Sequence, residues 1–141
     1  MPPAAFRHPS AGSTAEARFL LGQCYRLKDE NRLALATFQE VLKLTPGSPY
    51  TATATFLAGL SAEGLGDRQL ATGYYRQYAV LRPSVSGYVA VRLGDLYRGG
   101  NDPEAALKSY QDAAAAGLPP SPTVDALERA AAVQTTSKDL A

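Results

Sequence analysis

Apolar residues recur at intervals of three or four along most of this chain, and short polar turns interrupt them. Within residues 13–27, for example, Leu20, Leu21, Cys24 and Tyr25 follow helical spacing. Clusters of Gly, Pro, Asn and Asp separate this stretch from similar ones further along. The pattern predicts an all-α fold of seven helices, at about residues 13–27, 30–44, 48–63, 67–81, 84–99, 101–117 and 123–133.

Polar residues mark several of the predicted helix ends. Ser13 and Glu16 have the spacing of a capping box, which predicts a helix that begins at Ser13. Residues 1–12 before it show no periodicity and are expected to be disordered. Asp102 followed by Pro103 predicts another helix start, with a side-chain cap and a first-turn proline. Equivalent turn positions hold three residues that tolerate a left-handed backbone: Asp29, Gly66 and Asn101.

Three glycines, Gly22, Gly59 and Gly94, belong to copies of one pattern that are 37 and then 35 residues apart. An alanine follows each glycine after 12 residues, and an aromatic residue follows it after 16. These residues are Ala34, Ala71 and Ala106, then Phe38, Tyr75 and Tyr110. A period in the mid-thirties is typical of helix-turn-helix solenoids. We expect each glycine to face its alanine where paired helices cross, with the aromatic ring beside them.

The repeated pattern resembles the tetratricopeptide repeat (TPR) family over about residues 15–118. The first unit matches through Leu21, Gly22, Tyr25, Ala34, Phe38, Leu42, Leu44 and Pro46. The resemblance implies a right-handed α-solenoid of three full repeats plus a C-terminal helix. The expected segments are a tail at 1–12, repeats at 13–47, 48–83 and 84–118, a capping or partial fourth-repeat helix at 119–134, and a tail or truncated helix at 135–141.

In the TPR family, the first helices of successive repeats line a concave groove that binds a peptide or protein segment. The resemblance places the following residues on that groove: Phe19, Gln23, Arg26, Phe56, Leu60, Glu63, Tyr88, Val91, Arg92, Asp95 and Arg98. Their mixture of aromatic and charged side chains is typical of a peptide-binding face. The alternative is that Phe19, Phe56 and Val91 only pack between repeats.

Some members of the family hold a partner's C-terminal carboxylate with lysine, asparagine and further basic residues. Phe19 and Gln23 stand at the first two of those positions here, and Tyr88 stands at a later one. Only Arg92 fits, so we expect no carboxylate clamp.

Composition narrows the choice of partner. The net charge of +1 gives no strong field for nucleic acid or an anionic membrane. The single cysteine, Cys24, excludes an intramolecular disulfide and a Cys-based zinc site, and we expect it to be buried. The single histidine, His8, is expected to be solvated. The sequence contains no membrane-spanning apolar run and no signal-peptide h-region at its start.

Residues typical of catalysis or cofactor binding do not cluster in the sequence. It has no Ser/His/Asp or Cys/His set, no phosphate-binding glycine loop and no clustered metal ligands. We therefore expect a non-enzymatic protein–protein interaction scaffold without cofactor or metal. Its partner would be a protein or peptide. Self-association through the exposed ends of the repeat array is a further expectation.

A second resemblance leads to an alternative function. Tyr74, Tyr75 and Tyr78, with residues 88–95, are similar to the helical region that precedes the catalytic domain of some soluble lytic transglycosylases. The chain would then be a scaffold segment of a larger cell-envelope enzyme, with the catalytic domain elsewhere. Tyr74 is expected to be solvated, and Tyr75 and Tyr78 to pack.

The compartment depends on whether the chain is complete. A complete chain would be cytoplasmic, and a fragment of an exported protein would lie in the cell envelope. One more step of 35 from Ala106 reaches Ala141, and residues 138–141 resemble the opening of another repeat's second helix. Truncation from a longer array therefore stays open.

Overall fold

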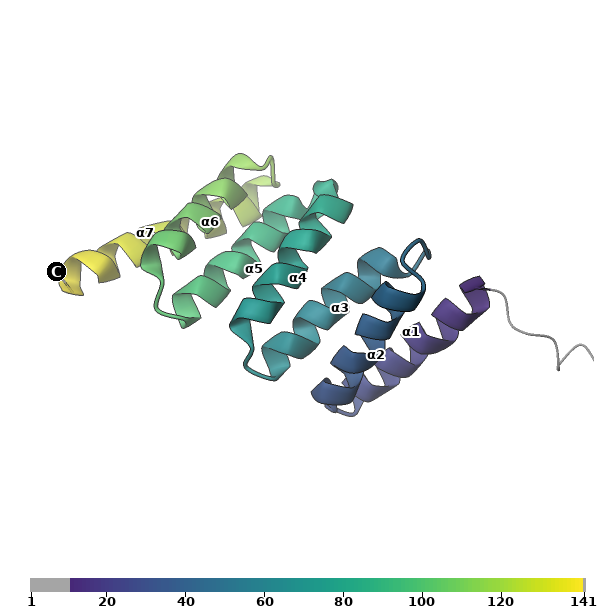
Figure 1. Cartoon of the computed structure of the whole chain (residues 1–141). Coiled ribbons are helices and arrows are strands. Elements are labelled where there is room, and N and C mark those ends of the chain that lie inside the picture. Colours follow the sequence, from purple (N-terminus) through teal and green to yellow (C-terminus); the bar gives the residue numbers. More distant parts are fainter. Residues whose placement is uncertain (1–10, 141) are drawn as a thin grey trace, which may run out of the picture. The chain divides into compact units, whose positions relative to one another are not determined.

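The computed structural model describes the backbone of residues 11–140 and the side chains of residues 14–138. Within these residues the chain forms seven α-helices and a short 3-10 helix, and no strand (Figure 1). The helices are α1 (Ala11–Leu27), α2 (Asn31–Leu44), α3 (Thr51–Gly64), α4 (Arg68–Leu81), η2 (Pro83–Val85), α5 (Ser86–Gly99), α6 (Pro103–Ala115) and α7 (Pro120–Leu140). The predicted all-α fold is confirmed.

The helices belong to two compact units, Met1–Tyr74 and Tyr75–Ala141, which divide within α4. In the first unit, α2 packs against both α1 and α3. In the second unit, α6 packs against both α5 and α7. Each unit therefore has a central helix with one neighbour on either side.

Three turns between helices share one backbone geometry. Asp29 and Asn101 both have a φ of 60°, and Gly66 has a φ of 78°. The amide that follows each of them bonds back over five residues: Glu30 to Tyr25, Asp67 to Ala62, and Asp102 to Tyr97, at 2.9–3.0 Å. This is the Schellman pattern, in which a left-handed residue closes the end of a helix. The prediction of left-handed turns is confirmed.

Two of the repeated glycines, Gly22 and Gly94, lie directly against aromatic rings. A Cβ built on Gly22 would lie 2.6 Å from Cε1 of Phe38, and one on Gly94 would lie 2.6 Å from Cδ1 of Tyr110. Ala34 and Ala106 are fully buried, but they are not the nearest neighbours of these glycines. The ring expected beside each glycine is thus its nearest neighbour at Gly22 and Gly94, and the expected contact with alanine stays a prediction. The missing side chain makes room for a ring from the paired helix.

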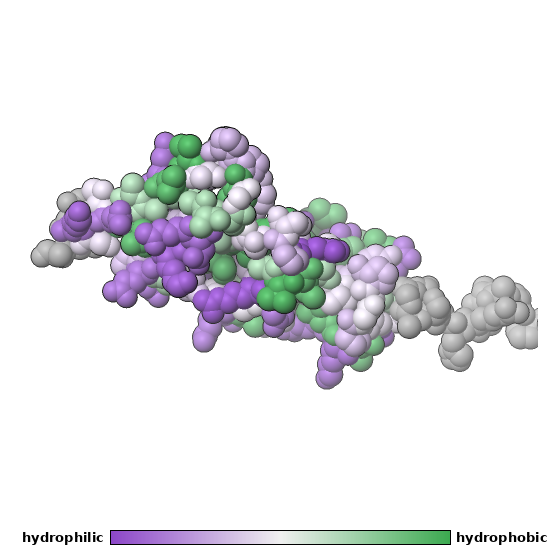
Figure 2. Space-filling model, turned by 90° about the horizontal axis from the view of Figure 1, so that it is seen from above, coloured by the Kyte–Doolittle hydropathy of each residue, from purple (hydrophilic) through white to green (hydrophobic). Residues whose placement is uncertain are grey.

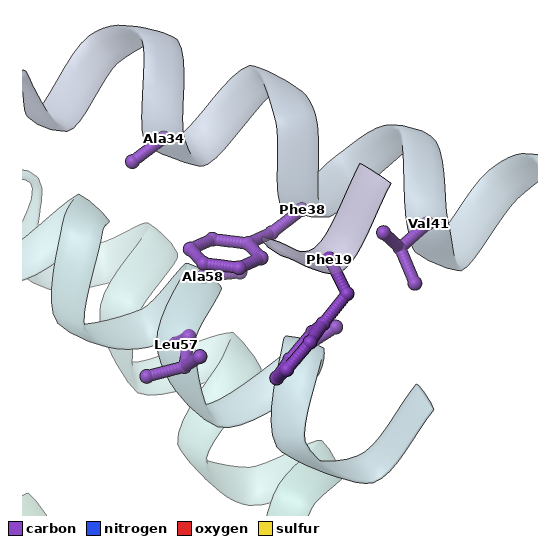
Figure 3. Packing of buried hydrophobic residues seen from close by; sticks show 7 residues of the cluster. Phe19, Ala34, Phe38, Val41, Leu57 and Ala58 are labelled. Atoms are coloured by element: carbon purple, nitrogen blue, oxygen red, sulfur yellow. The ribbon is translucent and has the colours of Figure 1, made fainter. Parts of the chain in front are cut away.

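Each unit has its own apolar core. In the first unit, Phe38 and Val41 of α2 pack between Phe19 of α1 and Leu57 and Ala58 of α3 (Figure 3). The core of the second unit is formed by Ala106 and Tyr110 of α6 with Ala130 and Val133 of α7. Two of the repeated alanine–aromatic pairs, Ala34 with Phe38 and Ala106 with Tyr110, thus lie on the central helices and form part of the two cores.

Helix α1 departs from the predictions at its start and on its outer face. It begins at Ala11, so Ser13 lies within the helix and the predicted capping box is wrong. Cys24 is exposed, and the expectation of a buried thiol is wrong as well. The face of α1 that packs carries Ala15, Phe19 and Gly22 instead. His8 lies outside the described residues.

Helix α7 is longer than predicted. It runs without a break from Pro120 to Leu140, so residues 135–140 continue it and are neither a tail nor the start of a separate helix. Ala141, the last step of the expected repeat, lies outside the described residues.

Two of the three tyrosines of α4 pack as expected, and the third differs. Tyr75 is fully buried and Tyr78 is half-buried. Tyr74 packs against the core of the first unit, and its hydroxyl accepts a hydrogen bond of 3.0 Å from Nε2 of Gln39. The expectation that Tyr74 is solvated is therefore wrong.

Candidate partner-binding surface

In the first unit, most apolar residues that were expected on the groove belong to the core. Phe19 is only 8% exposed, and its ring centroid lies 6.1 Å from that of Phe38 and 5.0 Å from that of Tyr50. Phe56 and Leu60 of α3 are half-buried and pack against the same cluster. Phe19 therefore packs in the core, as the alternative interpretation expected, and does not line a groove. Only parts of Phe56 and Leu60 reach solvent.

The polar residues expected on the first unit are all half-buried. Gln23 and Arg26 lie on α1, and Glu63 lies near the end of α3. Nε of Arg26 is buried and has no hydrogen-bond partner among the described residues. The guanidinium group of Arg26 is therefore only partly exposed and lacks a hydrogen-bond partner at Nε.

The second unit contains an open groove between α5 and α7, which we call the α5–α7 groove. Its volume is about 820 Å³, and its lining residues are Tyr88, Val91, Pro120, Ser121, Pro122, Val124, Asp125 and Glu128. Tyr88 is 49% exposed and Val124 is 52% exposed. Figure 2 shows that apolar residues also reach the surface in several other places, among polar ones. In the α5–α7 groove the apolar side chains line a hollow.

The loop from α6 to α7 positions the start of α7. Gly117 closes α6 with a φ of 76°, and the next residue, Leu118, lies against the beginning of α5. A Cβ on Gly87 would be 2.7 Å from Cδ2 of Leu118 and 3.1 Å from Cβ of Ala116. The close approach of this loop to α5 therefore favours glycine at residue 87, since a Cβ there would displace the side chain of Leu118. The sequence analysis did not identify this residue, because it lies outside the repeated glycine pattern.

A charged cluster joins α5, α6 and α7 in the second unit. Nη1 of Arg129 on α7 lies 2.7 Å from each carboxylate oxygen of Asp95 on α5. The hydroxyl of Tyr110 on α6 donates to Oδ1 of Asp95 at 2.6 Å, and Nε of Arg129 donates to Oδ2 of Asp125 at 3.2 Å. Asp95 was expected on the groove, but it ties α6 and α7 to α5. The sequence analysis missed Arg129.

The same cluster changes two ionisation equilibria. Burial of Tyr110 raises the pKa of its hydroxyl to about 12, and the hydrogen bond to Asp95 and the charge of that carboxylate act in the same direction. The hydrogen bond to Asp95 raises the pKa of Arg129. Both groups therefore keep their protons well above neutral pH, and the cluster stays intact there.

The remaining residues expected on α5 have mixed surroundings. Val91 is half-buried and packs against the core of the second unit while it also lines the groove. The guanidinium carbon of Arg92 lies 5.3 Å from the ring centroid of Tyr75, in a cation–π contact. Arg98 is exposed and lines a smaller pocket of about 240 Å³ that includes Pro103 and Val133.

The described residues do not meet the requirements of a metal site. Among the described residues, no group of three or more His, Cys, Asp and Glu side chains could hold a metal ion. The same part of the chain has no helix with the length and apolar character needed to cross a membrane.

Comparison with known proteins bears first on the N-terminal repeat. Residues 4–49 match the sequence model of the tetratricopeptide repeat family. The curated proteins contain no match to the chain.

Solved structures of similar fold match most of the chain. The crystal structure of PcrH from Pseudomonas aeruginosa is similar with a TM-score of 0.70 at 20% identity, over 93% of this chain and 98% of that chain. PcrH in complex with the chaperone binding region of PopD gives 0.73 at 19% identity, over 94% and 98%. The Sgt2 TPR domain from Aspergillus fumigatus gives 0.65 at 13% identity, over 99% and 87%. At these identities the likeness shows the fold alone, and it confirms the TPR-like helical solenoid.

Proposed function

We propose that this chain is a non-enzymatic protein-interaction module that holds a segment of a partner protein in the α5–α7 groove. The observation that carries the proposal is a hollow of about 820 Å³ lined by Tyr88, Val91 and Val124. Covering apolar side chains at a concave surface is favourable in free energy, because it removes apolar area from water. A hollow of this volume accommodates several side chains of a bound segment. Tyr88 supplies a large apolar contact area together with a hydroxyl, which suits a binding surface.

Proteins of similar fold support an interaction role. PcrH has been crystallised with the chaperone binding regions of PopD and PopB, and a further similar structure is the CopN–Scc3 complex. These partners are known for those proteins and are not assigned to this chain. For this chain, the shared fold favours binding of a protein segment over catalysis.

The groove favours a segment that is apolar and basic. Its walls carry Tyr88, Val91 and Val124, and the carboxylates of Asp125 and Glu128 also line it. Asp125 already accepts a hydrogen bond from Arg129, so Glu128 is the better partner for an incoming lysine or arginine. Because Glu128 is exposed, its charge should contribute more to selectivity than to affinity.

Further contacts are proposed around the charged residues of α1, α3 and α5. Gln23, Arg26 and Glu63 on the first unit keep partly exposed polar groups, as do Arg92 and Arg98 on the second unit. We propose that these residues bind polar groups of a partner. Phe56 and Leu60 would add only the surface that their core packing leaves uncovered.

We prefer the interaction module to a scaffold segment of a cell-envelope enzyme. The tyrosines that suggested the enzyme have packing roles, because Tyr75 is fully buried and Tyr74 lies against the core of the first unit. These roles account for both residues without any reference to a lytic domain.

Selection from a displayed library of random peptides tests the proposal. Apolar–basic segments should be enriched, and Val124→Asp should weaken their binding at least about tenfold, as expected when an apolar contact at the centre of an interface is lost. Val80→Asp is the matched control, because Val80 is 78% exposed on α4 and does not line the groove. Equal affinities of the two variants for the selected segments would contradict the proposal.

A further inference from the structure

A small pocket at the end of α5 differs from the α5–α7 groove in size and in chemistry. Its volume is about 240 Å³, and its lining residues are Arg98, Asn101, Pro103, Val133, Thr136 and Ser137. We call it the Arg98 pocket. None of its lining residues also lines the α5–α7 groove, so the two sites depend on different side chains.

Three elements of the second unit form the Arg98 pocket. Arg98 lies in the last turn of α5, Pro103 begins α6, and Asn101 lies in the turn between them with a φ of 60°. The remaining side is the last part of α7, where Thr136 and Ser137 lie. The continuation of α7 beyond its predicted end therefore forms one wall of the pocket.

Arg98 is the charged residue in the lining of this pocket. Among the described residues no ion pair joins it to a carboxylate, whereas Asp95, one turn earlier, is paired with Arg129. The hydroxyl of Tyr110 lies beside Arg98, but it is uncharged at neutral pH. Because the guanidinium stays protonated, Arg98 keeps an uncompensated positive charge at the pocket.

The other lining residues surround this charge with polar and apolar groups. The side-chain amide of Asn101 has two N–H donors, and the hydroxyl of Ser137 has one donor. The hydroxyl of Thr136 already donates to a backbone carbonyl of α7 at 2.9 Å. Pro103 and Val133 supply apolar surface. A positive charge, free donors and an apolar wall together favour an anion that carries a short apolar stem.

We propose that the Arg98 pocket binds a carboxylate on a short aliphatic stem. The planar guanidinium of arginine binds a carboxylate through two parallel hydrogen bonds. Pro103 and Val133 would contact the stem, which a phosphate ion lacks. Sites for drug-sized ligands have volumes of about 300–1,000 Å³, so this smaller pocket takes a small group, either a free acid or a side chain of a partner.

The proposal gives a ligand class to Arg98, for which we proposed contact with a polar group of a partner. In that respect it rests on the proposed function. It does not depend on the α5–α7 groove, however, because the two sites share no lining residue.

Nuclear magnetic resonance of the labelled full chain, titrated with butyrate, tests the binding of a carboxylate. Saturable shift changes are expected at Arg98, Asn101 and residues 133–137. Butyramide has nearly the same shape without the charge and should produce none of them, and inorganic phosphate should bind more weakly than butyrate. Sodium chloride at the same ionic strength controls for general effects of salt. Shifts that do not saturate with butyrate, or equal shifts with butyramide, would overturn the proposal.

Two substitutions with matched controls test the side chains of the pocket. Arg98→Gln should weaken butyrate binding at least about tenfold, because the charge-assisted hydrogen bonds are lost. Arg26→Gln is its control, since Arg26 has the same place in the first copy of the repeated pattern. Asn101→Gly keeps the positive φ and removes only the amide, so it should also weaken binding. Asp29→Gly changes the equivalent turn of the first unit and should leave binding unchanged. Unchanged binding in either pocket variant would overturn the proposal.

A peptide arm separates the two sources of the carboxylate. Tighter binding of a peptide with one internal glutamate than of butyrate, lost when glutamine replaces the glutamate, would support a partner's side chain. Equal affinities would support a free acid. Val124→Asp should leave butyrate binding unchanged while it weakens the apolar–basic segments. Loss of those segments alone would therefore contradict the proposed function, and absence of butyrate binding alone would contradict the Arg98 pocket.

Discussion

Replacing Gly22 or Gly73 by alanine should change stability in opposite directions, although both residues lie within helices. Glycine is less favourable than alanine inside a helix by about 1 kcal/mol, because it loses more backbone entropy on folding. A Cβ on Gly73 would have no neighbour within 4 Å. We therefore expect Gly73→Ala to raise the free energy of unfolding by about 0.5–1 kcal/mol.

At Gly22 the same methyl group has no room. It would lie 2.6 Å from Cε1 and 2.9 Å from Cδ1 of Phe38, which is fully buried. Carbon atoms pack best at about 3.5–4.0 Å, so the ring would have to move within a filled core. Such overpacking costs about 1–3 kcal/mol. Subtracting the gain in helix propensity leaves a loss of up to about 2 kcal/mol for Gly22→Ala.

Urea unfolding followed by far-ultraviolet circular dichroism measures both effects on the full chain. A Phe38→Leu background supplies the internal control, because the smaller side chain should relieve the clash. Gly22→Ala should then cost less than it does beside Phe38, which gives a coupling energy in a double-mutant cycle. If Gly22→Ala stabilised the protein as much as Gly73→Ala, the glycine–ring packing described above would be refuted.

Three further predictions concern the second unit. Gly94→Ala should destabilise the protein in urea unfolding as Gly22→Ala does, because its Cβ would overlap the ring of Tyr110; a neutral effect would contradict this. Arg129→Gln should loosen α7, which would be measured as faster amide exchange across residues 120–140. The loss of stability should stay below about 1 kcal/mol, because the ion pair with Asp95 is partly exposed. Unchanged amide exchange would contradict the role of this ion pair. The pKa of Tyr110 is about 12 in the folded protein and 10.0 in the unfolded chain, so its contribution to stability is complete below pH 10 and is lost between pH 10 and 12. Ultraviolet titration should show one late tyrosine that disappears in Tyr110→Phe, and an unchanged titration would refute this.

Much of the fold follows from local signals in the sequence. Asp29, Gly66 and Asn101 were identified as turn residues by type and position, and all three have positive φ. Asp102 caps α6 as predicted, since its Oδ1 accepts a hydrogen bond of 3.2 Å from the amide of Ala105. These features depend on backbone conformation over a few residues, which residue type largely determines.

The predictions that failed depend on which side chains meet in space. The first helix carries apolar residues on two faces, so periodicity alone could not decide whether Phe19 or Cys24 faces the core. The regular spacing of Gly22, Ala34 and Phe38 did predict that they lie together, but not that the ring is the nearest neighbour of the glycine.

The candidate site was predicted only in part. The resemblance to the TPR family placed Tyr88 and Val91 on a groove, and both line the α5–α7 groove. The other wall comes from α7, which has no repeat counterpart to guide the assignment. Asp95 was placed on the groove because of its position in α5, whereas its partner Arg129 lies 34 residues away. That distance is close to one repeat, and it is the signal that could have indicated the pair.

Nuclear magnetic resonance of the isotopically labelled chain, titrated with a selected apolar–basic peptide, tests the proposed binding site most directly. Shift changes should concentrate at Tyr88, Val91 and residues 120–128, and Val124→Asp should remove them at the same peptide concentration. A peptide that binds the chain while these residues keep their shifts would contradict the assignment of the α5–α7 groove as the binding site.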